Sequence, residues 1–368
     1  MRASGRRRMN VPVTVSAEVL ATELARLCPE HGIDLAGAVE LPAILPHEQR
    51  WHDWLAADRH GGLEYLTGDP QDRVDPLRRN PWAKSLLVFG QRYTHGWGAD
   101  STEPAATGAL APDALWVDRV ARYARGRDYH DVLLKAMKRL LGRLRETWPE
   151  LKAYPATDTG PYLEREWAWL AGLGFLGKNT CLIHEQLGSG FFLGVAPCNL
   201  EVTGLPPGGT PASEPLYGVV PRRRRPVVAV PTTRCGTCTR CVDACPTDAL
   251  DLHLGLDAHR CISTWTIEWQ GRTPPERRAD QGGILFGCDI CQAVCPWNRR
   301  AAERGGQVPL SDAYATDSAH AELDLAGLIA ISDAEFRERF RRTPLWRAHP
   351  EGMRRNADVV MENLASLD

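Results

Sequence analysis

The chain has 368 residues and a formal net charge of −2, which excludes a general electrostatic attraction to nucleic acid and leaves only local basic patches for contact with phosphates. No run of about 18 or more apolar residues occurs, so no membrane-spanning segment is expected. Eight of the eleven cysteines fall between Cys235 and Cys295, at the spacing of metal ligands. Because iron-bound thiolates need a reducing compartment, we expect a cytoplasmic protein.

Helical and strand patterns alternate over roughly the first 200 residues, which predicts an α/β or α+β unit. Residues 16–27 have the spacing of an amphipathic helix with Ser16 as its N-cap. Residues 84–90 form a short apolar run closed by glycine, which is typical of a buried strand. Residues 130–148 and 163–174 have helical periodicity, with apolar side chains on one face.

The second half of the chain begins with a segment rich in proline and glycine, residues 201–234, which predicts a linker and contains Arg222 to Arg225. After the cysteine-rich region, three short helices of a terminal bundle are predicted: residues 322–331, 333–342 and 351–367. We therefore expect three domains, with the bounds 1–225, 226–300 and 301–368.

The cysteines form two runs of the kind found in iron–sulfur proteins. The first is Cys235-x2-Cys238-x2-Cys241-x3-Cys245-Pro246, the bacterial ferredoxin spacing, in which three cysteines bind one cluster and the fourth reaches the other. The second run has the sequence Cys288-x2-Cys291-x3-Cys295-Pro296 and lacks one cysteine of the full pattern. Cys261, which stands between the runs, can supply the missing thiolate.

This count predicts two [4Fe-4S] clusters that are close enough to pass single electrons. One would be bound by Cys235, Cys238, Cys241 and Cys295, and the other by Cys245, Cys261, Cys288 and Cys291. The alternative is a pair of zinc sites, but zinc ribbons use separated C-x2-C pairs. The other cysteines, Cys28, Cys181 and Cys198, are expected to be buried small side chains.

The chain has neither a dinucleotide-binding fingerprint nor a Walker loop. Residues 157–180 are therefore the segment in which we expect catalytic side chains. Asp158 precedes a turn that opens a helix, and a carboxylate there can donate or accept a proton. Its alternative role is that of a helix cap. Glu164, Arg165 and Glu166 are expected to form a solvated helix face.

The sequence resembles the epoxyqueuosine reductase family over roughly residues 15–365. The matching segments are RYARGRDYH (122–130), DTGPYLERE (158–166), AGLGFLGKNT (171–180), CGTCTRCVDACPTDAL (235–250), RCISTWTIE (260–268), FGCDICQAVCPWN (286–298) and RRNA (354–357). The cluster ligands predicted above agree with this family's set. The resemblance implies an α+β fold: a cobalamin domain similar to nitroreductases and reductive dehalogenases, a ferredoxin-like two-cluster module, and a small C-terminal helical domain that could be HEAT-like.

The resemblance also implies the reaction, which is reduction of epoxyqueuosine to queuosine at the wobble position of tRNA by a monomeric enzyme. Cobalamin would be the reactive centre, the clusters would supply electrons from an external donor, and Asp158 would be the catalytic acid. In a dry pocket, Asp158 is expected to stay protonated near neutral pH. By position, four residues match corrinoid contacts: Leu182, Leu193, Ser263 and Asp289.

A histidine ligand to cobalt is not expected, because the motif D-x-H-x-x-G fails after Asp128-Tyr129-His130. His130 is therefore interpreted as a structural or substrate-contacting residue. Contacts with tRNA phosphates are expected from basic groups, for which the candidates are Arg222 to Arg225, Arg354, Arg355 and the basic residues of 337–347.

Three other classes of protein are alternatives to this interpretation. They are a dehalogenase-like cobalamin reductase of a small molecule, a non-catalytic iron–sulfur electron carrier, and a nucleic-acid-binding protein with a structural cluster. The chain departs from the family pattern at residues 91–98 and 199–230, and both departures could change the entrance for the substrate.

Overall fold

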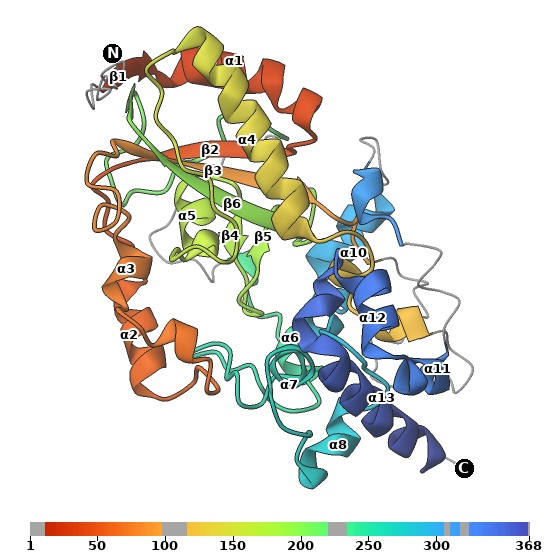
Figure 1. Ribbon diagram of the computed structural model, residues 1–368. Helices are drawn as coiled ribbons and strands as arrows, with labels where there is room; N and C mark the ends of the chain where they lie inside the picture. Colours follow the sequence, from red (N-terminus) through yellow and green to blue (C-terminus); the bar gives the residue numbers. More distant parts are fainter. Residues whose placement is uncertain (1–11, 98–115, 220–233, 305–309, 317–323, 367–368) are drawn as a thin grey trace.

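The computed structural model describes residues 12–97, 116–219, 234–304, 310–316 and 324–366. At its centre lies an antiparallel sheet with the strand order β2-β3-β6 (Figure 1). The strands are β2 (Leu35–Glu40), β3 (Ser85–Arg92) and β6 (Phe191–Cys198). Helices pack around this sheet, so the predicted α+β class is confirmed.

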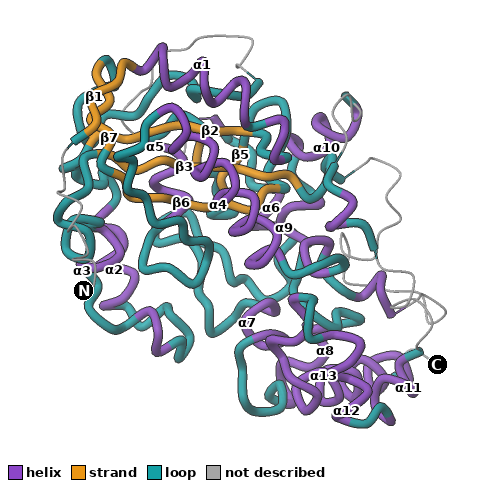
Figure 2. The backbone as a smooth tube through the Cα atoms, turned by 45° about the horizontal axis from the view of Figure 1, so that its top comes forward, coloured by secondary structure: helices purple, strands orange, loops and turns teal. Residues whose placement is uncertain are grey.

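The sheet is covered by helices on both faces. Helices α1 (Ala17–Leu27) and α4 (Tyr129–Thr147) pack on one face, and α5 (Glu164–Leu170) packs on the other (Figures 1 and 2). Successive side chains of a strand point to opposite faces, so every residue of β3 is buried. This explains why the strand appears in the sequence as an unbroken apolar run.

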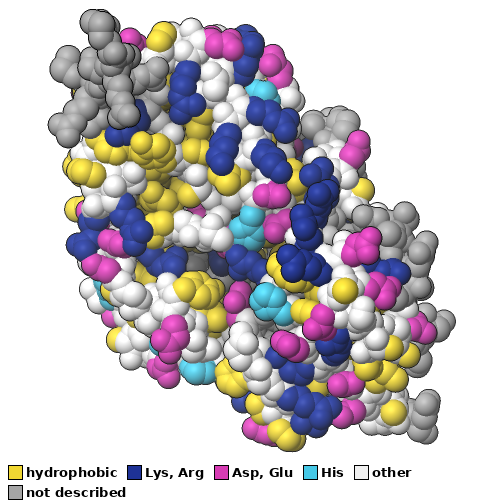
Figure 3. Space-filling view, viewed as in Figure 1, with side chains coloured by type: hydrophobic (Ala, Val, Ile, Leu, Met, Phe, Trp, Pro, Cys, Tyr) yellow, Lys and Arg dark blue, Asp and Glu magenta, His cyan; other side chains and the backbone are white. Residues whose placement is uncertain are grey.

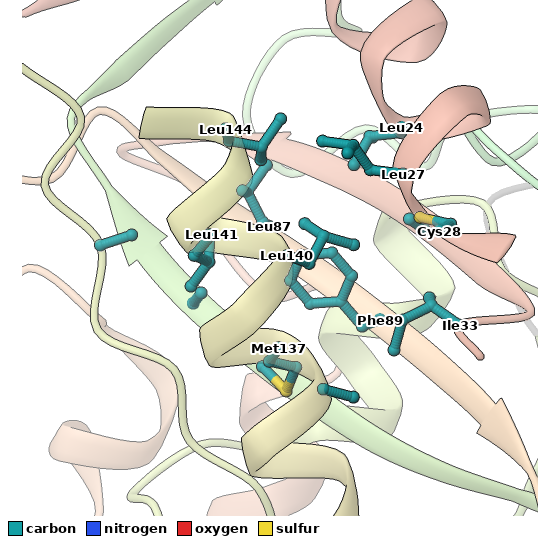
Figure 4. Close-up of a cluster of buried hydrophobic side chains, with 14 of the residues drawn as sticks. Leu24, Leu27, Cys28, Ile33, Leu87, Phe89, Met137, Leu140, Leu141 and Leu144 are labelled. Carbon is teal, nitrogen blue, oxygen red and sulfur yellow. The ribbon is translucent and has the colours of Figure 1, made fainter. Parts of the chain in front are cut away.

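The alternation along β3 divides the core into two layers. Leu87 and Phe89 pack under α4 and α1, where Leu140 and Leu24 are fully buried (Figure 4). Leu86 and Val88 face the other way and pack with the tryptophans and leucines of α5.

The predicted start of the first helix agrees with the structure, whereas one predicted helix end does not. Ser16 caps α1, and its hydroxyl accepts a hydrogen bond from the Val19 N–H at 3.3 Å. The helix predicted at 163–174 is shorter than expected, because Gly172 adopts a left-handed φ of +79° just after it ends.

The predicted linker at 201–234 is partly wrong. Strand β7 (Leu200–Thr203) pairs in parallel with β1 (Val13–Ser16), and Tyr217 exchanges two backbone hydrogen bonds of 2.9 Å with Ala36 of β2. The first part of this segment therefore belongs to the sheet domain, and its proline and glycine content concealed a short strand. Arg222 to Arg225 lie outside the described residues.

Short elements connect the sheet to the cysteine-rich region. They are α2 (Glu48–Ala56), α3 (Gln71–Val74), and the pair β4 (Phe175–Leu176) and β5 (Leu182–Ile183). The cysteine-rich region itself holds α6 (Arg240–Asp243), α7 (Ile262–Ile267), α8 (Pro275–Gln281), α9 (Ile290–Ala293) and α10 (Pro296–Glu303). Helices α6 and α9, which lie within the two cysteine runs, contact each other.

The three terminal helices form as predicted: α11 (Leu325–Ala330), α12 (Asp333–Phe340) and α13 (His349–Ala365). They gather at the end of the molecule away from β1 and β7 (Figures 1 and 2). The buried amide of Asn356 donates to the carbonyls of Thr266 at 2.7 Å and Leu285 at 2.9 Å, which fixes α13 to the cysteine-rich region. In the described part of the chain, no helix has the length and apolarity needed to cross a membrane.

A pair of glycine substitutions tests the packing of α5 against the sheet. A Cβ on Gly37 would lie 2.4 Å from the carbonyl oxygen of Ala171, whereas a Cβ on Gly142 of α4 would meet nothing within 4 Å. Gly37→Ala should therefore lower the free energy of unfolding by about 1–3 kcal/mol, and Gly142→Ala should raise it by about 0.5–1 kcal/mol. Thermal unfolding followed by circular dichroism measures both. Equal stability of the two variants would contradict this packing.

Candidate active site and cluster region

Asp158 lies where three distant parts of the chain meet. Its Oδ2 is 3.0 Å from Nε2 of His130, at the start of α4, and 3.4 Å from a guanidinium nitrogen of Arg347. The other ring nitrogen of His130, Nδ1, lies 2.6 Å from Oδ1 of Asp128. Arg347 belongs to the turn between α12 and α13, and it also reaches Glu268 at 3.5 Å. The C-terminal bundle thus supplies a side chain, Arg347, that contacts the predicted catalytic acid.

The protonation of this group differs from the sequence-based expectation. Burial would raise the pKa of Asp158, but the hydrogen bond from His130 and the charge of Arg347 outweigh burial and hold the pKa below its ordinary value. For His130, burial would lower the pKa, but the hydrogen bonds with Asp128 and Asp158 raise it to about 9. Asp158 is therefore ionised near neutral pH, and the proton resides on His130. The expected dry pocket is also absent around Asp158, whose side chain is 48% exposed.

Asp158 borders two cavities. The inner cavity has a volume of about 250 Å³, and its wall is largely aromatic and aliphatic, including Tyr93, Tyr123, Phe192, Leu182 and Leu193. The outer cavity has a volume of about 470 Å³ and a charged wall, which contains Arg73, Arg79, Glu268 and Arg347. Asp158 is thus a wall residue of both cavities.

The four predicted corrinoid contacts separate into two pairs. Leu182 and Leu193 line the inner cavity together with Asp158. Ser263 and Asp289 are not part of that wall: Ser263 is half-buried on α7, and the buried carboxylate of Asp289 accepts a hydrogen bond from the Arg122 N–H at 2.8 Å. A corrinoid contact by the second pair stays a prediction.

Glu164 is a residue of the inner cavity that the sequence analysis placed wrongly on a solvated face. Its Oε1 is buried without a hydrogen-bond partner among the described residues, and burial raises its pKa to about 7. The helical spacing to the buried Trp167 and Ala168 of α5 could have revealed this, because positions i, i+3 and i+4 share a face. Glu166 is half-buried and contacts Nδ1 of His47 at 2.6 Å, so only Arg165 is exposed as expected.

The first predicted group of cluster cysteines converges on one cavity. Its volume is about 160 Å³, and its wall contains all four thiols of the group: Cys235, Cys238, Cys241 and Cys295. Among the described residues, no three His, Cys, Asp or Glu side chains are placed to hold one metal ion. Four thiols around one cavity are the donor set that a four-iron cluster requires.

The cysteines of the second predicted group are half-buried, like Cys235, Cys238 and Cys241 of the first group, whereas Cys295 of the first group is buried. Burial raises the pKa of Cys288, and the neighbouring thiols of Cys261 and Cys245 raise it further. Burial together with Cys181, Cys288 and Cys261 raises the pKa of Cys291. Cys241 of the first group also raises the pKa of Cys291. Cys181, which lines the inner cavity, neighbours thiols of both groups, namely Cys295 of the first and Cys291 of the second.

Comparison with known proteins decides the family. A family model described as "Epoxyqueuosine reductase QueG, DUF1730" matches residues 73–159, and a model described as "4Fe-4S double cluster binding domain" matches residues 234–298. The epoxyqueuosine reductase of Cyclobacterium marinum is 32% identical over 89% of this chain and 93% of its own length. That of Gloeobacter violaceus is 36% identical over 84% of this chain and 85% of its own. The chain belongs to the epoxyqueuosine reductase family. It is an oxidoreductase, as predicted.

Solved structures of this family have the same fold. The crystal structure of an epoxyqueuosine reductase with an epoxyqueuosine-modified tRNA-Tyr stem loop superposes with a TM-score of 0.74 and 27% identity, over 95% of this chain and 82% of the other. The Bacillus subtilis epoxyqueuosine reductase, in a structure with an aspartate catalytic loop swung out of the active site, gives a TM-score of 0.73 and 26% identity. That alignment covers 95% of this chain and 82% of the other.

Two cysteine variants test the assignment of the cluster ligands. Cys261→Ala removes one thiolate of the second group, so the iron content after anaerobic reconstitution should fall to about half of the wild-type value. Cys181→Ala is the matched control, because this half-buried cysteine neighbours the cluster cysteines but is assigned to neither group; the expectation that it is fully buried was wrong. Full iron in the first variant, or loss of iron in the control, would show that the ligand set is different.

His130→Gln tests where the proton of the site is held. The pKa of His130 is raised from 6.5 to about 9, so its stabilising contribution is fully present below pH 6.5 and is lost as the pH rises through 9. The variant should be less stable than wild type by about 2–3 kcal/mol at pH 6, with a much smaller difference at pH 10. Urea unfolding at both pH values measures this. A difference that does not change with pH would place the proton elsewhere.

Proposed function

We propose that this protein reduces epoxyqueuosine to queuosine in tRNA. The observation that carries the proposal is the position of Asp158 between a charged outer cavity and an apolar inner cavity that adjoins the cluster cysteines. In such an arrangement, a tRNA base in the outer cavity would receive protons from the Asp158 site and electrons from the side of the cluster cysteines. Family membership and the relative's structure with an epoxyqueuosine-modified tRNA stem loop support this substrate.

The reaction requires protons at the oxygen that leaves. Reduction of an epoxide to an alkene breaks both carbon–oxygen bonds, consumes two electrons and two protons, and releases the oxygen as water. His130 holds one of these protons as an imidazolium, and Asp158 passes it to the leaving oxygen, which is a far stronger base than either residue. Arg347 holds the Asp158 carboxylate in place between the two cavities.

The inner cavity, with a volume of about 250 Å³, can hold part of a corrin ring, and its wall offers both apolar and polar side chains to such a ring. Its aromatic and aliphatic wall can pack on a corrin ring, and the unpartnered Oε1 of Glu164 can accept a hydrogen bond from an amide at the corrin edge. Leu182 and Leu193 would contact the ring, as the family resemblance implies. When bound, cobalamin supplies the cobalt centre that acts on the epoxide carbon, and the clusters supply electrons one at a time.

Phosphates of the tRNA would meet basic side chains on the outer face of α4, the helix that begins beside His130. Lys and Arg side chains line this helix (Figure 3), and the exposed ones are Lys135, Lys138, Arg139 and Arg143. Two of the arginines expected to bind phosphate are engaged elsewhere. Arg354 is paired with Asp333 at 2.5 Å, and Arg355 donates to the Trp269 carbonyl at 2.7 Å.

The proposal is tested by the anaerobic, cofactor-reconstituted protein acting on epoxyqueuosine-containing tRNA, with queuosine measured by mass spectrometry. Wild type should form queuosine, and Asp158→Asn should lower kcat by about 100-fold or more, because the amide cannot relay a proton. Asp131→Asn is the matched control: this exposed acid on α4 pairs only with Lys135 among the described residues. An active Asp158→Asn enzyme, or no queuosine from wild type with both clusters bound, would contradict the proposal.

A further inference from the structure

The cavity of the first cysteine group is surrounded by cations. Its wall contains Lys178, Arg234, Arg240 and Arg300, together with the four thiols. We call these four side chains the basic rim. They come from three separate parts of the chain: the turn before β5, the first cysteine loop with α6, and α10. The fold therefore gathers this positive charge at the cavity, because the four side chains do not come from a single basic run in the sequence.

Most of this charge is not neutralised within the described residues. Arg234 is paired with Glu185, but none of the ion pairs found among the described residues involves Lys178, Arg240 or Arg300. The ammonium of Lys178 instead donates to the backbone carbonyls of Gly236 at 2.8 Å and Cys238 at 3.0 Å, within the cysteine loop.

The two arginines that are free of ion pairs face the solvent. Arg240 and Arg300 are both exposed, and the guanidinium of Arg300 is held over the ring of Trp297 at 5.4 Å. Gly236 and Thr237, in the loop between the first two cysteines, are also exposed. The first cysteine group is thus reachable from the surface across a positively charged border.

The cavity of the first cysteine group lies close to the inner cavity. The two-residue strand β5 separates these two cavities, because Leu182 lines the inner cavity and its neighbour Ile183 lines the cavity of the first cysteine group. An electron that enters at the rim therefore meets the first cysteine group within one strand of the inner cavity that Asp158 borders.

We propose that the basic rim docks an acidic protein that carries a one-electron flavin or iron–sulfur centre and delivers electrons to the first cluster. This inference rests on the proposed function, which needs an external reductant. In each docking event the carrier is oxidised by one electron and the first cluster is reduced by one, so one epoxide requires two events. Complementary charge accelerates such encounters, and the small interfaces of redox pairs let the spent carrier leave quickly.

The experiment follows cluster reduction by stopped-flow absorbance, without tRNA, in the fully reconstituted protein. Two reductants are compared: a reduced acidic flavodoxin, and reduced methyl viologen, which is small and cationic. The variants are Arg240→Glu, Arg300→Glu and their combination. Arg26→Glu on α1 is the matched control, because this exposed arginine lies on the far side of the sheet domain from α6 (Figure 1). If the double variant loses its clusters, Arg240→Gln and Arg300→Gln take its place.

The rim variants should slow reduction by flavodoxin by about ten-fold or more at low salt, with a weaker dependence on ionic strength. Reduction by methyl viologen should not slow, and Arg26→Glu should behave as wild type. Slower reduction by both reductants would overturn the proposal, because the arginines would then act on the cluster itself. Unchanged rates with flavodoxin, or a loss of tRNA binding instead, would also overturn it. Because the assay contains no tRNA, failure of the proposed function would be seen separately.

Discussion

The contact of Asp158 with His130 and Arg347 is the constraint on which the site depends. It joins a loop of the sheet domain, the first turn of α4 and the C-terminal bundle at one carboxylate. Asp158 also has a left-handed φ of +55°, a conformation that costs a residue other than glycine about 1–3 kcal/mol and persists only where the surroundings enforce it. The C-terminal bundle is therefore part of the arrangement around Asp158, although it lies far from Asp158 in the sequence.

Asp158 lies in the wall of two cavities. One is the charged outer cavity, and the other is the inner cavity, which strand β5 separates from the cavity of the first cysteine group and its basic rim. Under the proposed function, the proton would come from His130 and the electrons from the side of the basic rim, so the two supplies would reach Asp158 from different directions.

The sequence predicted those features that depend on local spacing. The helices and the buried strand β3 followed from periodicity, and the cysteine spacing predicted the double-cluster domain. The assignment of the eight cysteines to two groups and the role of Asp158 implied by the family resemblance stay predictions. Features that depend on tertiary contact were missed. The proton on His130 requires Asp128, Asp158 and Arg347 to be brought together by the fold, and no spacing rule contains Arg347. Strand β7 was missed because its pairing with β1 links opposite ends of the sheet domain.

The central claim is that Asp158 is ionised near neutral pH and that His130 holds the proton. Infrared difference spectroscopy between wild type and Asp158→Asn at pH 7, with isotope-labelled aspartate, measures this directly. The account predicts the loss of a carboxylate band, with no loss in the region of protonated carboxyl groups. Loss of a protonated carboxyl band at pH 7 would contradict it and would make Asp158 itself the group that holds the proton.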